Sequence, residues 1–142
     1  MIATNLKRCR ENLEMTQTEL GNVFGVHNST VRGWENAYDT MPLRKLVKFS
    51  NMYNYSIDYI LGLSKSNKIF DTKIKLNRKS IGNKIRTIRK KLNLSQQELA
   101  DICSISRACL SHYEIGMSLI NTITLYTLCK TYNLSIDELL RK

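Results

Sequence analysis

Apolar residues recur along the chain at the three- and four-residue spacing of amphipathic helices. One such series is Ile2, Leu6, Cys9 and Leu13, and an equivalent series in the second half of the chain is Ile81, Ile85, Ile88 and Leu92. This spacing places each series on one face of a helix. The alternation of single apolar and polar residues that is typical of strands is almost absent. The pattern therefore predicts an all-α fold.

Capping signals divide this pattern into short helices. Thr16 followed by Glu19, and Ser95 followed by Glu98, are capping boxes, whose hydroxyl and carboxylate groups bind the free amides at a helix start. Gly25 is expected to take the left-handed conformation that ends the helix after Thr16. Further helices are predicted around Val31 and Trp34, around Leu46, Phe49 and Tyr53, and around Ile57, Ile60 and Leu61, with equivalents later in the chain.

The chain contains an internal repeat. Residues 2–62 align without a gap with residues 81–141, at an offset of 79. Identical pairs include Arg10 and Arg89, Gln17 and Gln96, Leu20 and Leu99, and Glu35 and Glu114. We therefore predict two domains of five helices each, copy one over residues 1–62 and copy two over residues 81–142, joined by a linker over residues 63–80.

The charge of the chain favours a polyanionic partner. The formal net charge is +10, and the predicted linker carries six basic and one acidic side chains, which is half of that excess. Nucleic acid and an anionic membrane surface both fit such a charge. No apolar run is long enough to cross a bilayer and no secretory signal is present, so we expect a cytoplasmic protein without a membrane partner.

Metal, disulfide and enzyme chemistry are poorly supported. The four cysteines show no CxxC spacing, and the chain has only two histidines. Free thiols in a reducing compartment are the expectation, and no cofactor or metal is expected. There is no phosphate-loop glycine pattern and no histidine beside a plausible nucleophile, so we do not expect an enzyme.

Two short helices joined by a tight turn form a helix-turn-helix in each copy. Gly21 and Ala100 are the small residues that such close helix packing requires. The run from Gln17 to Glu35, with Leu20, Gly25, Val26, Val31 and Trp34, resembles the repressor/Cro-type helix-turn-helix family, often called XRE, and so does the run from Gln96 to Gly116. The resemblance implies compact five-helix DNA-binding domains and transcriptional regulation, most often repression, in a bacterium or phage. It also implies structural ion pairs between Arg10 and Glu35 and between Arg89 and Glu114. In this family the second helix of the motif enters the major groove.

The candidate DNA contacts follow from this resemblance and from the outward face of the second helix. In copy one they are Gln17, Asn28, Ser29, Thr30, Arg32, Gly33 and Asn36, and in copy two they are Gln96, Ser106, Arg107, Ala108, Ser111 and His112. The glutamines are expected to contact phosphate, and the asparagine and arginines to pair with adenine and guanine. His27 stands where a serine or threonine cap is typical, so Asn28 has capping as an alternative role.

The two copies differ most on this outward face, while the residues behind it are repeated. Copy two has Ala108, Cys109 and Ile115 there and is less polar. This leaves two roles open for copy two, which are base contacts such as thymine methyls and binding of a protein partner, as in an antitoxin or an adaptor to the transcription machinery. Homodimerisation also stays open. The main hypothesis is a sequence-specific regulator that binds double-stranded DNA.

Overall fold

The described residues fold into two compact units of five helices each. The computed structural model describes residue 2 and residues 4–141; residues 1, 3 and 142, which the predicted domains include, lie outside the described residues. Unit 1 spans Met1–Asp71 and unit 2 spans Thr72–Lys142. The predicted all-α class is confirmed, since the described residues form helices and no strand.

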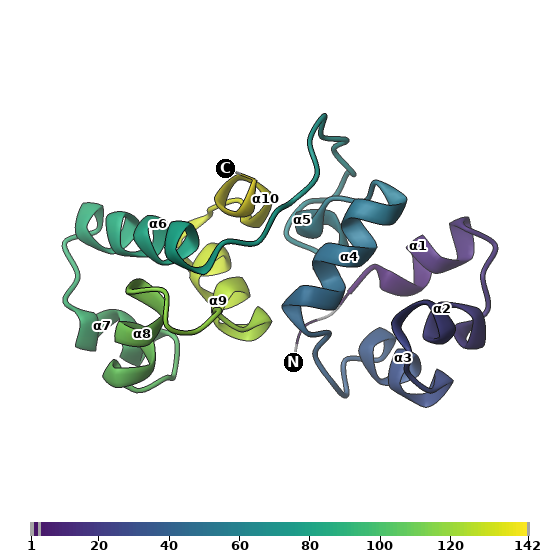
Figure 1. The fold of residues 1–142 in the computed structure, drawn as a ribbon, viewed down its shortest axis with the longest axis horizontal. Helices are drawn as coiled ribbons and strands as arrows, with labels where there is room; N and C mark the ends of the chain where they lie inside the picture. The colour runs from purple at the N-terminus through teal and green to yellow at the C-terminus, as the bar shows by residue number, and fades with distance from the viewer. Residues whose placement is uncertain (1, 3, 142) are drawn as a thin grey trace. The chain divides into compact units, whose positions relative to one another are not determined.

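Each unit repeats the same order of helices (Figure 1). Unit 1 contains α1 (Leu6–Asn12), α2 (Gln17–Phe24), α3 (Asn28–Glu35), α4 (Leu43–Tyr53) and α5 (Ile57–Ile60). Unit 2 contains α6 (Arg78–Lys91), α7 (Gln96–Ile102), α8 (Arg107–Glu114), α9 (Thr122–Tyr132) and α10 (Ile136–Leu140). In unit 1, α3 packs against α2 and α1, and in unit 2, α8 packs against α7 and α6.

The predicted helix starts and the predicted stop at Gly25 are confirmed. The Thr16 hydroxyl accepts a hydrogen bond from the Glu19 amide at 3.0 Å, and the Glu19 carboxylate accepts one from the Thr16 amide at 2.9 Å. Ser95 and Glu98 make the same pair of bonds in unit 2. Gly25 adopts φ 65°, which is the left-handed conformation that glycine favours.

The two cores differ in the side chains that fill them. In unit 1, Phe24 meets Trp34 edge to face, with the ring centroids 6.0 Å apart, and also lies beside Phe49. The equivalent positions of unit 2 hold Cys103, Tyr113 and Leu128, all buried. The same backbone arrangement is thus filled by an aromatic cluster in one unit and by smaller side chains in the other.

The division between the units falls inside the predicted linker, residues 63–80. Asn67 belongs with unit 1, because its side chain accepts from the Ser56 amide at 2.7 Å and donates to the Asn54 carbonyl at 3.0 Å. Ile74 is buried, and α6 begins at Arg78, so the end of the predicted linker is part of unit 2. These side chains are the physical reason that the predicted connector divides between the two units.

Ser104 of unit 2 has a left-handed backbone conformation, which serine disfavours. It adopts φ 57° where unit 1 has Gly25. We expect Ser104→Gly to raise the free energy of unfolding of unit 2 by about 0.5–1 kcal/mol, because relief of a left-handed serine exceeds the added freedom of the unfolded chain. Amide hydrogen exchange in α7 and α8 measures this change.

The reciprocal change is a matched control. A side chain at Gly25 would meet no atom within 4 Å, so Gly25→Ser tests the backbone conformation alone. We expect it to lower the free energy of unfolding of unit 1 by a similar amount, measured by urea denaturation with fluorescence from Trp34, the single tryptophan. Equal stability of both variants and the wild type would show that glycine is not favoured over serine at this left-handed position.

Candidate nucleic-acid interface

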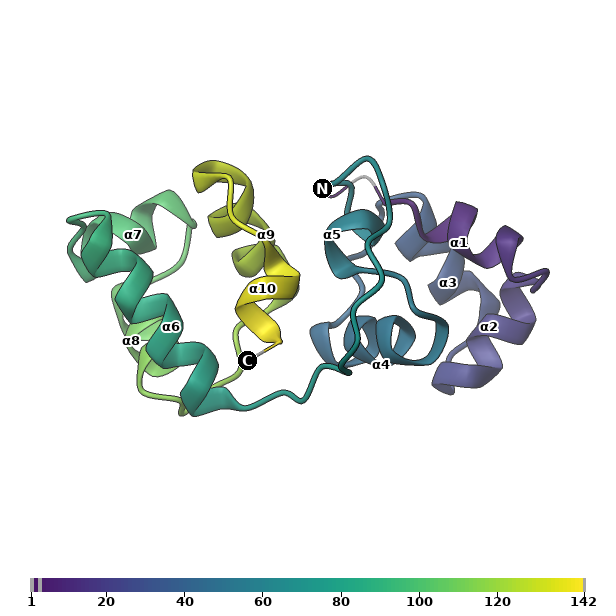
Figure 2. The same ribbon diagram turned by 90° about the horizontal axis from the view of Figure 1, so that it is seen from above.

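The helix-turn-helix of unit 1 is held by a close approach between α2 and the turn. The Val26 amide donates to the Gly21 carbonyl at 2.9 Å. A Cβ atom at Gly21 would lie 2.6 Å from the Val26 carbonyl oxygen, so the turn as it stands leaves no room for a side chain there. In unit 2 the buried Ala100 takes this place. Figure 2 shows α2 beside α3 in unit 1, and Figure 1 shows α7 beside α8 in unit 2.

His27, and not Asn28, caps α3. The Nδ1 atom of His27 accepts a hydrogen bond from the Ser29 amide at 3.1 Å. Asn28 is the first residue of α3, and its side-chain amide donates to the Thr18 hydroxyl at 3.2 Å. The alternative in which Asn28 caps the helix is therefore wrong, because the ring nitrogen of His27 already accepts the hydrogen bond from the Ser29 backbone amide.

A buried ion pair ties the end of α3 to α1. In unit 1 the Nε atom of Arg10 lies 2.6 Å from one carboxylate oxygen of Glu35, and its Nη2 atom donates to the other at 3.1 Å. Only 1% of the Glu35 side chain is exposed. Arg89 and Glu114 repeat this arrangement in unit 2 at 2.7 and 3.0 Å. Both ion pairs implied by the sequence resemblance are confirmed.

The arginine of each pair also binds the loop that precedes the motif. Arg10 donates to the Met15 carbonyl at 2.8 Å, and Arg89 donates to the Leu94 carbonyl at 2.9 Å. The carboxylate of Glu35 holds the arginine in its charged form, because the hydrogen bonds between them raise the pKa of Arg10. Each pair is therefore a bidentate contact that fixes α1, the loop and the end of the recognition helix together.

Gln17 and Gln96 extend these two networks. The Gln17 amide donates to the Glu35 carboxylate at 3.0 Å, and the Gln96 amide donates to Glu114 at 3.1 Å. Both side chains are half-buried. The glutamines were expected to contact phosphate; in this structure their amide groups position the start of α2 or α7 against the end of the recognition helix.

Unit 1 exposes part of its predicted contact face. Ser29, Arg32 and Asn36 are exposed, and Asn28 and Thr30 are half-buried. The prediction that Gly33 faces outward is wrong, because Gly33 is buried and a Cβ atom there would lie 2.9 Å from the Asp39 carboxylate. The Gly33 carbonyl accepts hydrogen bonds from the Tyr38 and Asp39 amides, which folds the chain after α3 over this glycine.

Unit 2 presents a different set of side chains on α8. Arg107, Ala108 and His112 are exposed, while Ser111 is half-buried. Ser106 is exposed and caps α8, where its hydroxyl accepts from the Cys109 amide at 3.0 Å. Apart from Gln96 on α7, the predicted residues of copy two therefore lie on α8 and at its cap, where Arg107 and His112 are exposed and polar.

Three apolar side chains are exposed at and after the end of α8, where unit 1 has residues with polar groups. Ile115, Met117 and Ile123 are 56%, 60% and 51% exposed. The equivalent residues of unit 1 are Asn36, Tyr38 and Arg44, all exposed and all with polar groups. The two units thus differ in chemistry both on the recognition helix and in the chain that follows it.

Thr18 and Gln97 form a pair of equivalent positions beside the contact face that were not predicted from the sequence. Thr18 is exposed and holds the side chain of Asn28, and its equivalent Gln97 is exposed and donates to Asp101 at 2.8 Å. Both are the second residue of the first motif helix. Their difference in side chain, inside a repeat that is otherwise similar there, was the signal that could have identified them.

The described residues offer neither a membrane-spanning helix nor a metal site. No helix among them is long and apolar enough to cross a membrane. No group of three or more histidine, cysteine, aspartate or glutamate side chains among them has the arrangement to hold a metal ion.

Comparison with known proteins supports the repeat. A helix-turn-helix family model matches residues 6–60 and again residues 85–139. The chain is 34% identical over 64 residues to the uncharacterized HTH-type transcriptional regulator YobD of Bacillus subtilis (strain 168), covering 45% of this chain and 57% of that protein. It is 39% identical over 59 residues to the antitoxin PezA of Streptococcus pneumoniae, covering 42% and 37%.

A third relative aligns over a longer part of the chain. The HTH-type transcriptional regulator ImmR of Bacillus subtilis (strain 168) is 28% identical over 100 residues, covering 70% of this chain and 68% of that protein. The chain spans less than two thirds of the length of YobD and of PezA. The similarity to those two proteins is therefore confined to roughly the length of one unit.

The buried ion pair of unit 1 gives a test of what fixes α3. We expect Arg10→Met to lower the free energy of unfolding of unit 1 by about 3–5 kcal/mol, because Glu35 would remain buried without its charged partner. The double variant Arg10→Met/Glu35→Leu is expected to lose much less, since no buried charge is left. Urea denaturation followed by Trp34 fluorescence measures both.

The neighbouring exposed arginine supplies the control. Arg8→Met is expected to change the free energy of unfolding by no more than about 0.5 kcal/mol, because Arg8 lies on the surface. A loss in the double variant as large as that in Arg10→Met would show that the arginine acts through packing and not through the buried carboxylate.

Proposed function

The chain belongs to the helix-turn-helix family, and we propose that it is a cytoplasmic, sequence-specific DNA-binding regulator of transcription that acts as a repressor. The observation that carries this proposal is the pair of recognition helices, each held from behind by a buried ion pair and each presenting an exposed arginine, Arg32 on α3 and Arg107 on α8. No catalytic step and no cofactor is part of the proposal.

Arg32 and Arg107 are the proposed base-specific contacts. An arginine in the major groove pairs with guanine through two hydrogen bonds, which discriminates against a wrong base by about 1–3 kcal/mol. Asn28 offers an amide for adenine, and its bond to Thr18 orients that amide. Ser29, Asn36 and the histidine of α8 surround the arginines as secondary contacts, with Ala108 placed to meet a thymine methyl.

Positive charge outside the two motifs supports binding to the phosphate backbone. Residues 63–80 carry six basic side chains, and all six are exposed. Lysine and arginine that neutralise phosphates release counterions, so affinity from this source falls with salt. We propose that these residues follow phosphates between two half-sites, and that one chain binds both without requiring a second copy.

The alternative function is a protein-binding role for unit 2. It is favoured by the exposed Ile115, Met117 and Ile123, since apolar surface next to a DNA contact face is more typical of protein interfaces. One relative of the chain, PezA, is named an antitoxin. In this alternative, unit 1 alone binds DNA bases and unit 2 holds a protein.

Selection of bound sequences from a random DNA pool tests both functions. With the full chain at near-physiological salt, we expect two different sequence motifs at a fixed spacing. Arg32→Ala is expected to relax one motif at a single position and Arg107→Ala to relax the other, each by about 1–3 kcal/mol of discrimination. Competition titrations with single-base variants of the selected site measure these losses.

Matched arginines away from the motifs complete the design. Arg8 on α1 and Arg86 on α6 are exposed, and their replacement by alanine is expected to leave both motifs unchanged. If Arg107→Ala also leaves the selected sequence unchanged, the protein-binding role of unit 2 is favoured. Failure to enrich any sequence would overturn the regulator proposal.

A further inference from the structure

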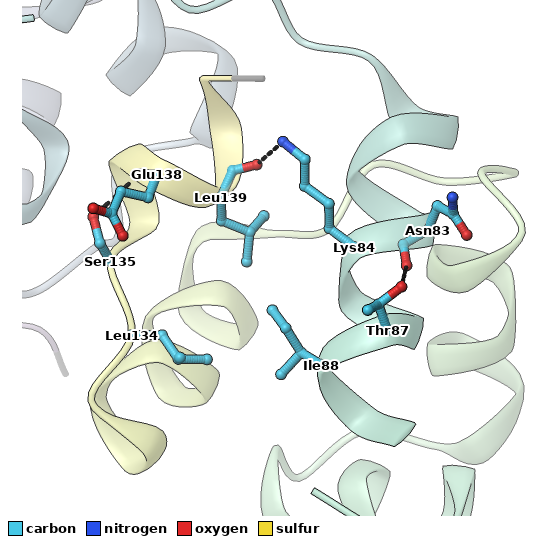
Figure 3. A pocket seen from close by; sticks show the side chains of 8 residues that line it. All are labelled: Asn83, Lys84, Thr87, Ile88, Leu134, Ser135, Glu138 and Leu139. Atoms are coloured by element: carbon cyan, nitrogen blue, oxygen red, sulfur yellow. Dashed lines mark hydrogen bonds between the residues drawn. The ribbon is translucent and has the colours of Figure 1, made fainter. Parts of the chain in front are cut away.

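Unit 2 contains a pocket that the proposed DNA contacts do not use. Its volume is about 310 Å³, within the usual range for small-molecule sites, and it lies between α6 and the segment that leads into α10. Figure 3 shows Ile88, Leu134 and Leu139 facing one another across it, with Lys84 reaching over from α6 toward α10. The interior is therefore apolar and its edge carries a cation.

The pocket exists because the two units join their first and last helices differently. In unit 1 the Asn5 amide donates directly to the Ile60 carbonyl at 2.7 Å, which holds α5 against the backbone at the start of α1. The equivalent residue, Lys84, lies inside α6, so its amide belongs to the helical hydrogen-bond ladder. Only the tip of its side chain reaches the Leu139 carbonyl, at 2.7 Å.

The longer first helix of unit 2 follows from the sequence before it. The Asn77 side chain accepts from the Ser80 amide at 3.0 Å and starts α6 at Arg78. In unit 1 the helix starts only at Leu6, the equivalent of Ile85. A flexible lysine stem thus spans a gap in unit 2 that a direct backbone contact closes in unit 1.

Unit 1 has tyrosines at two of the positions equivalent to the pocket lining. Tyr55 and Tyr59 stack with their centroids 6.1 Å apart and their planes 17° from parallel, and Tyr59 is buried. Cys9, the equivalent of Ile88, is completely buried, which raises the pKa of its thiol to about 12. Ile88 itself is half-buried. Unit 2 has Leu134 and Glu138 where unit 1 has the two tyrosines, so the rings are missing there.

We propose that the pocket between α6 and α10 is a binding site for a small aromatic molecule with a phenol-like ring. The ring supplies the aromatic surface that unit 2 lacks at the positions equivalent to Tyr55 and Tyr59, and packs between Ile88, Leu134 and Leu139. A polar substituent on the ring lies at the open edge beside the Lys84 ammonium. This site is independent of the proposed DNA contacts.

Binding of p-cresol, the side-chain analogue of tyrosine, tests the proposal. The full chain, labelled with 15N, is titrated with p-cresol into the millimolar range in the absence of DNA. We expect saturable shifts of the backbone amide signals of Ile88, Leu134 and Leu139, and a rise in the melting temperature of unit 2, because the ligand binds only the folded state. Absence of saturable shifts in these signals overturns the proposal.

Two variants fill the pocket from opposite sides. Leu134→Tyr/Glu138→Tyr places the two rings of unit 1 at the equivalent positions of unit 2, and Thr87→Tyr places a ring at an exposed position of α6. Each is expected to raise the dissociation constant for p-cresol by at least about tenfold, which is 1.4 kcal/mol. Circular dichroism tests whether each variant is folded. If the double variant is not folded, Thr87→Tyr still tests the proposal.

Two results would overturn the assignment in different ways. Unchanged affinity in the folded variants would place the p-cresol site elsewhere. Equal affinity for cyclohexanol, which has a similar size but no flat ring, would remove the assignment to aromatic ligands. Since no DNA is present, neither result bears on the regulator proposal, and loss of DNA binding in Arg107→Ala does not bear on this one.

Discussion

The buried carboxylate at the end of each recognition helix is the constraint on which both units depend. Glu35 and Glu114 have almost no exposed side chain, so each requires a partner that replaces its lost hydration. An arginine on the first helix meets this need with two parallel hydrogen bonds, and a glutamine at the start of the first motif helix adds a third. Three helices are therefore fixed around one charge, and the outer face of the recognition helix is free to vary because nothing in this network points toward it.

This separation explains which features the sequence could predict. Periodic apolar residues, capping boxes and the repeat predict the helices and their order, because each signal acts within a few residues of the structure it determines. The ion pairs were implied by a resemblance, and their identical 25-residue spacing in both copies agrees with the contacts found. Features that depend on a second segment were harder to predict. Gly33 was assigned outward from helical geometry, but Asp39 folds back over it, and no periodic pattern marks that return.

The contacts of Gln17 and Gln96 are a second case that the sequence could not predict. A glutamine at the start of a helix near DNA is chemically suited to contact phosphate, and the sequence contains nothing against this role. The structure places a carboxylate 3.0 Å from the Gln17 amide, and that distance decides its present contact. The linker is a further case. Its charge was visible in the sequence, but the hydrogen bonds of Asn67 and the burial of Ile74 depend on the folded units beside it.

The two units show how one scaffold accommodates different surfaces. Where unit 1 has Tyr55 before its last helix and Tyr59 on it, unit 2 has Leu134 and Glu138, and a pocket is present between its first and last helices. Where unit 1 has polar residues after its recognition helix, unit 2 has exposed Ile115 and Met117. Neither change touches the buried ion pair or the close approach at the turn. Surfaces outside that network are therefore free to diverge at little cost in stability, so new binding functions in this chain are expected on the outer faces of its helices and not at the ion pair or the turn.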